Sequence, residues 1–334
     1  MKIYYRLCIA SLILAFSVIL AGGIVRTTGS GMGCPDWPKC FGQYIPPTDI
    51  SQLPPNYKAV FQVKGKEIAD FDAFKTWVEY INRLLGAILG IMIVIQTLLA
   101  LRLRSYDFWL PILSIALLIV TGFVGWLGSV VVATDLEPFK ITVHMMTSIV
   151  IITLATTLVH KAKAIRLKDQ TPDHSTDRPL ALPSFFFIVL ATAICCTLAQ
   201  IIMGTQVREQ IDTFSKALEG RWREKWIEQL SFVFIAHRSF SWIIMGLNGY
   251  IIWRILKLVG VSEYANSLAL RRLMMALASL ILLEIFLGII MTYFAIPKIA
   301  QPLHLLCAIS IFAVQWRFGL MVWNIGIATK QHPN

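Results

Sequence analysis

Two short segments of this chain resemble each other but differ at the two places where chemistry could occur. Residues 79–83 read EYINR and residues 234–238 read FIAHR, each at the outer end of a long apolar run. The first segment carries the carboxylate of Glu79 and the amide of Asn82, where the second has a phenylalanine and the imidazole of His237. Such groups are costly inside a membrane and usually face a bundle interior or a cavity. The difference predicts two copies of one helix with different chemical roles.

Three of the six histidines fall inside apolar runs, namely His144, His237 and His304. His237 and His304 both lie about one turn from the outer ends of their predicted helices. Two neutral imidazoles that face each other across a bundle can fill both axial positions of a haem iron, which suits electron transfer. The alternative is that each histidine packs between helices and hydrogen-bonds a neighbour. A zinc ion would need further ligands at that level, and the sequence supplies none there.

The other half of the chain keeps His144 but has Asn82 in place of the second histidine. An asparagine amide is a poor iron ligand, so a haem at His144 would have one open or water-filled side, where iron can activate oxygen. Glu79 precedes Asn82 by three residues and so shares its helical face. Its carboxylate could move protons or stabilise positive charge on a substrate. The alternative is an interfacial carboxylate paired with Arg83 or Lys75.

Four arginines lie at the outer ends of the apolar runs, close to these candidates: Arg26, Arg83, Arg208 and Arg238. A haem carries two propionates, and arginine is the natural partner of a carboxylate at low dielectric. Anchoring at the membrane interface is the alternative. In the loop after the first run, Cys34 and Cys40 enclose a short proline-rich segment. Two cysteines this close in an oxidising compartment favour a disulfide, with a redox role as the alternative.

The composition indicates which elements position these residues. The chain has 334 residues, 57% of them hydrophobic and only 15% charged, with a mean hydropathy of +0.68. These values predict an all-α membrane protein, since a helix crosses the hydrocarbon core with about 20 apolar residues. Eight segments meet that length: 7–25, 77–101, 109–132, 141–160, 183–206, 231–256, 273–295 and 303–327.

The distribution of basic residues predicts that both termini lie in the cytoplasm. With that orientation the inner segments are short, basic and poor in acids, whereas the outer loops 27–75 and 208–230 mix both charges. The first run lacks a small-x-small cleavage signal before Gly22, so we interpret it as a helix and not as a signal peptide. A net charge of +11 is then ordinary for a protein in the lipid bilayer. No basic-aromatic patch points to nucleic acid.

An internal repeat relates the two halves, because four anchors recur in the same order. The anchors are Gly22, Asn82, Gly128 and His144 in the first half and Gly204, His237, Gly288 and His304 in the second. In both halves the histidine follows the second glycine by sixteen residues. The repeat predicts two pseudo-symmetric four-helix bundles, residues 1–160 and 183–334, joined by a cytoplasmic linker over 161–182.

Residues 22–38, GGIVRTTGSGMGCPDWP, closely resemble the signature at the first span of haem A synthases, and the later anchors match as well. The resemblance implies a haem b cofactor in the C-terminal bundle. It also implies that haem O is the substrate, bound in the N-terminal bundle and oxidised at a ring methyl to a formyl group. The product is haem A, which serves cytochrome oxidase assembly. The implied partners are haem O synthase and a membrane electron donor or acceptor. Whether the chain forms a homo-oligomer is left open by the sequence.

Carried over to this sequence, the resemblance makes His237 and His304 the haem b ligands and places His144 beside the substrate haem. Glu79 matches the family's essential glutamate, and the two loop cysteines match its extracytoplasmic disulfide. Asn82 departs from the family, which generally has a second histidine there. Three other functions remain open: a dihaem b-type electron carrier linked to quinol, a haem transporter or chaperone, and a membrane scaffold whose histidines only pack.

Overall fold

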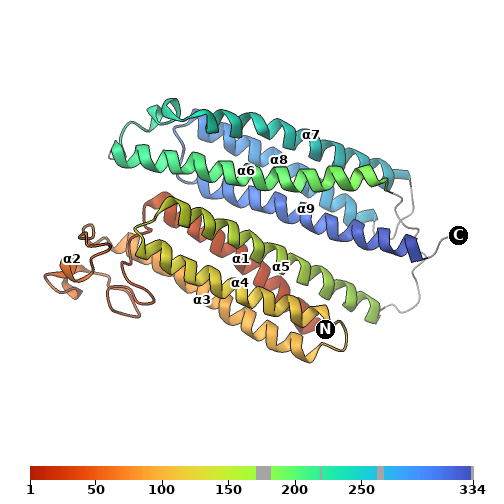
Figure 1. Cartoon of the computed structure of the whole chain (residues 1–334), viewed down its shortest axis with the longest axis horizontal. Coiled ribbons are helices and arrows are strands. Elements are labelled where there is room, and N and C mark those ends of the chain that lie inside the picture. The colour runs from red at the N-terminus through yellow and green to blue at the C-terminus, as the bar shows by residue number, and fades with distance from the viewer. Residues whose placement is uncertain (171–181, 219, 262–266, 332–334) are drawn as a thin grey trace. The chain divides into compact units, whose positions relative to one another are not determined.

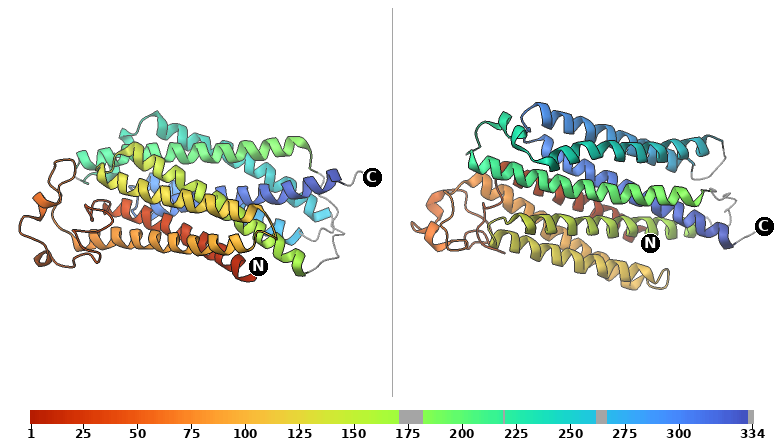
Figure 2. Two further views of the ribbon diagram at one scale, coloured as in Figure 1. Left: turned by 60° about the horizontal axis from the view of Figure 1, so that its bottom comes forward. Right: turned by 45° about the horizontal axis from the view of Figure 1, so that its top comes forward.

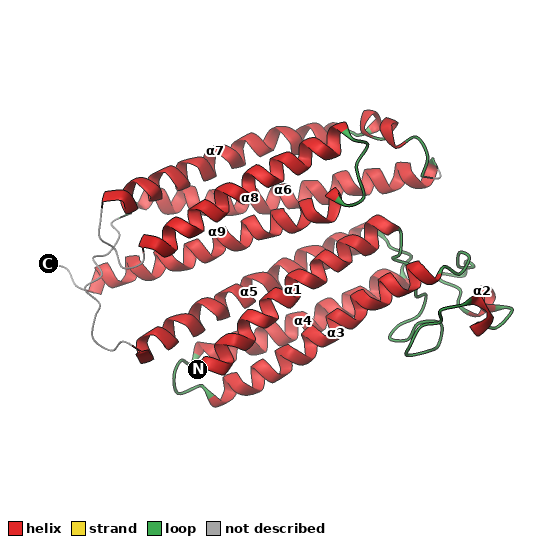
Figure 3. Ribbon diagram, turned by 180° about the vertical axis from the view of Figure 1, so that it is seen from behind, coloured by secondary structure: helices red, strands yellow, loops and turns green. Residues whose placement is uncertain are grey.

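The computed structural model describes residues 1–170, 182–218, 220–261 and 267–331. These residues form helices joined by loops and turns (Figure 3). The chain divides into two compact units, Met1–Arg166 and Leu167–Asn334. Within each unit, four long helices run lengthwise beside one another (Figures 1 and 2).

The long helices of the first unit are α1 (Lys2–Thr28), α3 (Ala73–Arg102), α4 (Trp109–Ala133) and α5 (Pro138–Gln170). Those of the second unit are α6 (Ser184–Ala217), α7 (Phe232–Val261), α8 (Ser267–Tyr293) and α9 (Ala300–Gln331). The short elements are the helix α2 (Tyr57–Val60) and the 3-10 turns η1 (Ile50–Gln52), η2 (Arg223–Lys225) and η3 (Ile227–Gln229). Among the described residues, eight helices are long and apolar enough to cross a membrane. The predicted all-α membrane fold with eight spans is confirmed.

Several helices are longer than the apolar segments that predicted them. Helix α6 continues to Ala217 and α5 to Gln170, beyond the predicted ends at 206 and 160. Hydropathy marks only the stretch that lies in hydrocarbon, whereas a helix propagates past it as long as each residue adds a hydrogen bond. The predicted linker 161–182 therefore begins inside α5, and its residues 171–181 lie outside the described part of the chain.

The helix ends that flank the first outer loop have clear local causes. Helix α1 ends where Gly29 adopts a left-handed φ of 67°, which is the usual glycine cap. Helix α3 begins after Asp72, whose carboxylate accepts the backbone N–H of Lys75 at 3.1 Å. The loop between these two caps projects beyond the helix ends of its unit and contains α2 (Figure 1).

Each unit has a well-packed interior to which all four long helices contribute. Tyr4, Ile93, Leu117 and Ile152 are at most 2% exposed in the first unit, as are Phe186, Ile251, Met274 and Phe318 in the second. One pair of buried polar side chains joins two helices in each interior. The Tyr4 and Ser114 hydroxyls lie 2.9 Å apart, and the Gln315 amide donates to Asn248 at 2.8 Å. Such bonds hold helices in register inside a membrane.

Candidate functional site

In the second unit, both predicted haem-ligand histidines lie against glycines of neighbouring helices. A Cβ atom built on Gly204 of α6 would lie 3.3 Å from Cε1 of His237 in α7. A Cβ atom built on Gly288 of α8 would lie 3.7 Å from Cε1 of His304 in α9. Because glycine has no side chain, each imidazole can approach the neighbouring backbone closely. The two glycines therefore make the space that the rings occupy.

The two imidazole rings are separated by the distance that a shared metal ion requires. The ring centroids of His237 and His304 are 6.4 Å apart, with 72° between the ring planes. A histidine nitrogen binds a metal ion at about 2 Å, so two rings on opposite sides of one ion have centroids roughly 6 Å apart. The described residues contain no group of three or more His, Cys, Asp or Glu side chains that could hold a bare ion. A porphyrin brings its own nitrogens, so this donor pair fits a bis-histidine haem.

Two polar side chains outside the predicted site lie beside these histidines, although neither ring Nδ1 has a hydrogen-bond partner among the described residues. The Gln200 amide donates to the backbone carbonyl of His237 at 2.8 Å. Oε1 of Glu284 lies 3.2 Å from Nδ1 of His304. Glu284 was detectable from sequence by the criterion that identified the histidines, because it is an ionisable residue inside an apolar run. Gln200 carries no comparable sequence signal.

The same glycine contacts recur in the first unit. A Cβ atom built on Gly128 of α4 would lie 3.5 Å from Cε1 of His144 in α5. A Cβ atom built on Gly22 of α1 would lie 3.8 Å from Oδ1 of Asn82 in α3. Asn82 Oδ1 and His144 Nδ1 are buried and have no hydrogen-bond partner among the described residues. Asn82 therefore takes the place in its unit that His237 takes in the other, in agreement with the predicted repeat.

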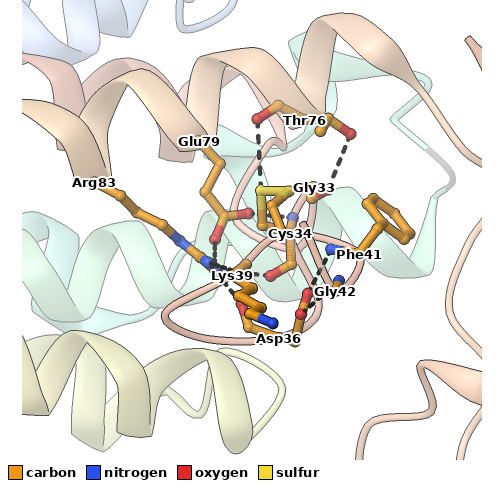
Figure 4. Close-up of a disulfide and its surroundings, with 10 residues drawn as sticks. Gly33, Cys34, Asp36, Lys39, Phe41, Gly42, Thr76, Glu79 and Arg83 are labelled. Carbon is orange, nitrogen blue, oxygen red and sulfur yellow. Dashed lines mark hydrogen bonds and ion pairs between the residues drawn. A yellow bond between two sulfur atoms is a disulfide. The ribbon is translucent and has the colours of Figure 1, made fainter. Parts of the chain in front are cut away.

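Glu79 is buried at 4% exposure, and both of its carboxylate oxygens have partners (Figure 4). Oε2 accepts the backbone N–H of Cys34 at 2.9 Å, and Oε1 accepts from the Arg83 guanidinium at 2.5 Å. Arg83 also donates to three loop carbonyls, those of Cys34 (2.8 Å), Asp36 (2.6 Å) and Lys39 (3.0 Å). The ion pair between Glu79 and Arg83, which is the alternative to a catalytic role of Glu79, is therefore present. Proton transfer by Glu79 and propionate binding by Arg83 stay predictions.

The predicted disulfide between Cys34 and Cys40 is confirmed. Its loop lies directly on α3, because Thr76 Oγ1 donates to the carbonyl of Gly33 at 2.9 Å. A Cβ atom on Gly33 would lie only 2.5 Å from a backbone carbonyl oxygen of α3, so the contact requires glycine. The Asp36 carboxylate accepts two backbone N–H groups of the loop, at 2.6 and 2.8 Å. The loop is thus fastened to the helix that carries Glu79 (Figure 4).

The remaining predicted arginines lie in different surroundings. The Arg26 guanidinium is 3.7 Å from Sδ of Met145, the residue after His144 in α5. Arg208 forms an ion pair with Asp212 at 2.7 Å and also contacts Gln301. Arg238 is exposed. Arg26 and Arg208 therefore lie near a candidate histidine helix, and their binding of propionates stays a prediction.

Comparison with known proteins agrees with this arrangement. A family model described as cytochrome oxidase assembly protein matches residues 5–316. The chain is 28% identical to a haem A synthase of Shewanella oneidensis over 54% of this chain and 52% of that relative. The alignment therefore covers about half the length of that relative. A haem A synthase of Brucella ovis is 24% identical over 94% of this chain and 88% of its own length. The chain belongs to the haem A synthase family of cytochrome oxidase assembly proteins.

Proposed function

We propose that this chain is a haem A synthase, an oxidoreductase that converts a ring methyl of haem O to a formyl group by successive hydroxylation. Its family and the names of its relatives support this activity. The eight apolar helices suit a cytoplasmic-membrane enzyme, and we place both termini in the cytoplasm. Haem O synthase would supply the substrate, and a membrane partner would donate or accept electrons.

Haem b would be held in the second unit by His237 and His304. The ring separation of 6.4 Å and the two glycine contacts support this assignment. With both imidazoles as ligands, the bound haem b would supply electron transfer. The protein would contribute the two ligands, with Gln200 bonded to the backbone carbonyl of His237 and Glu284 beside the ring of His304.

The first unit would hold the substrate, haem O, beside His144 and Asn82. The Asn82 amide is a poor metal ligand, so it would leave one side of the substrate open to chemistry. Glu79 lies one turn before Asn82 on α3, and its carboxylate is held by Arg83 and the Cys34 N–H. A carboxylate held in place before the reaction is suited to stabilise positive charge that develops on the substrate. Arg26, beside Met145, is positioned near the histidine helix to bind a propionate.

The observation that carries this proposal is the difference between two otherwise matching glycine contacts. Gly204 meets an imidazole, whereas Gly22 meets the amide of Asn82. A carrier with two permanent bis-histidine haems would need an imidazole at both places. The amide in the first unit favours one permanent cofactor and one substrate site.

Pigment analysis tests the activity directly. Cells that make haem O should accumulate haem A when this chain is expressed, and haem O when it is absent. Haems extracted from both cultures can be identified by mass. Two tightly bound haem b groups in the purified protein, with no haem A in the cells, would instead establish the dihaem carrier.

Asn82→His tests the equivalence of the two units. The variant should fold and show a second bis-histidine spectrum when loaded with haem, because Gly22 leaves space beside residue 82 as Gly204 does beside His237. Absorption and electron paramagnetic resonance spectra of the purified variant measure this. Loss of folded protein, with Leu84→His on the exposed side of α3 still folding, would contradict the equivalence.

A further inference from the structure

Glu284 is a carboxyl group inside an apolar helix, and the proposed reaction does not use it. It lies in α8, and its Oε1 is 3.2 Å from Nδ1 of His304. Its other oxygen, Oε2, is buried and has no hydrogen-bond partner among the described residues. An ionisable group is costly in such a helix unless it has a task. Its position beside a proposed haem ligand indicates what that task is.

The contacts of His304 assign different surroundings to its two ring nitrogens. Gly288 follows Glu284 by one helical turn and approaches Cε1 of the ring. The edge of the imidazole that contains Nδ1 and Cε1 is therefore covered by α8, with the carboxyl group at Nδ1. The remaining nitrogen, Nε2, is left for a metal ion. Nδ1 has no hydrogen-bond partner among the described residues, and Oε1 of Glu284 lies 3.2 Å from it. A hydrogen bond from Nδ1 to this carboxyl oxygen would select the tautomer that has its proton on Nδ1 and its lone pair on Nε2.

The repeat makes this arrangement specific to the second unit. Glu284 precedes its glycine by four residues, and Gln200 stands at the same distance before Gly204. The residues four before the corresponding glycines of the first unit, Gly22 and Gly128, are Val18 and Val124. Both positions in the second unit therefore hold a polar residue, with Glu284 beside the ring of His304 and Gln200 bonded to the backbone carbonyl of His237, where the first unit has valine. A permanent cofactor needs firmly oriented ligands, whereas a substrate must leave its site after reaction.

We propose that Glu284 is a positioning residue for His304, which orients the imidazole and makes Nε2 a stronger ligand for the haem of the second unit. The inference rests on the haem b site proposed above. A carboxyl group that accepts a hydrogen bond from the non-ligating ring N–H of a metal-bound histidine fixes the ring orientation and raises the basicity of the ligating nitrogen. A more basic ligand stabilises oxidised iron relative to reduced iron. Glu284 therefore tightens haem binding and lowers the midpoint potential of the bound haem.

The Cys307 thiol is the other group at this carboxyl. Cys307 lies one turn after His304 in α9, and its Sγ is 3.1 Å from the backbone carbonyl of Leu280. It also lies beside the Glu284 side chain. A merely structural carboxyl would serve to join α8 to α9 through this thiol. That role would leave the potential of the haem unchanged when Glu284 is replaced.

Two substitutions separate these roles in the full-length protein loaded with haem b. Glu284→Gln keeps the size and one acceptor oxygen, so it should retain the bis-histidine spectrum with a more positive midpoint potential. Glu284→Val copies Val124 of the first unit. It should weaken haem binding roughly 10-fold or more, as loss of an outer partner of a metal ligand typically does, and raise the potential further. Leu283→Val, on the exposed neighbour in α8, is the matched control and should change neither quantity.

Haem titration followed by absorption and a spectroelectrochemical titration give the two measurements. Wild-type affinity and midpoint potential in Glu284→Val would overturn the inference and leave the haem site standing. If Glu284→Val does not fold, an unchanged midpoint potential in Glu284→Gln overturns it. Absence of a bis-histidine spectrum in the wild-type protein would instead contradict the proposed haem b site itself.

Discussion

His304→Ala should abolish the low-spin haem b spectrum of the purified protein, and His237→Ala should do the same. The two rings lie 6.4 Å apart, so each would supply one of the two protein ligands of the proposed haem b, and removal of either would leave only one. Nearly all low-spin haem should be lost, because alanine has no donor atom and Gly204 or Gly288 would then border an empty space. Absorption and electron paramagnetic resonance spectra of the variants measure the loss.

His144→Ala is the matched control for this experiment. It removes an imidazole of similar burial that also packs against a glycine, but it lies in the other unit. Haem b of the second unit should keep its spectrum in this variant, while haem A output should fall. A bis-histidine spectrum that survives in His237→Ala and in His304→Ala would show that other residues ligate the haem.

Glu79→Gln should leave haem b bound but lower haem A output roughly 100-fold or more, the size of effect expected when a positioned acid or base is lost. The substitution removes the negative charge while keeping the side-chain shape. The substitution disturbs only local contacts. Two donors, Arg83 and the Cys34 N–H, each bond a different carboxylate oxygen of Glu79, and glutamine keeps only one of those oxygens. Haem A and haem O extracted from cells expressing the variant give the output.

Two controls separate chemistry from damage to the loop. Glu67→Gln removes an exposed carboxylate of the same loop and should leave haem A output unchanged. Thiol labelling of Glu79→Gln should show that the Cys34–Cys40 disulfide remains closed. Normal haem A output in Glu79→Gln would contradict a catalytic role and favour a haem transporter or chaperone.

The spans, the repeat and the candidate histidines were all predictable from the sequence. Each depends on properties that a linear pattern contains. A helix that crosses hydrocarbon must be apolar over its whole length, and an ionisable residue in it stands out. The anchors of the repeat were also predictable, because duplicated helices preserve residue type and order. Their spacing anticipated that Asn82 and His237 occupy equivalent places, in agreement with their glycine contacts.

Only the tertiary structure decided which side chains share a contact. Arg83 donates to loop carbonyls that are 44 to 49 residues away in the chain, and no local pattern predicts those partners. Glu284 meets His304 because helices α8 and α9 are rotated so that these two faces oppose each other. The hydropathy pattern indicates how far across the membrane a residue lies. The rotation of each helix about its own axis is set by packing against its neighbours. Sequence therefore determined which helices carry the candidate residues, and packing determined which of those residues are in contact.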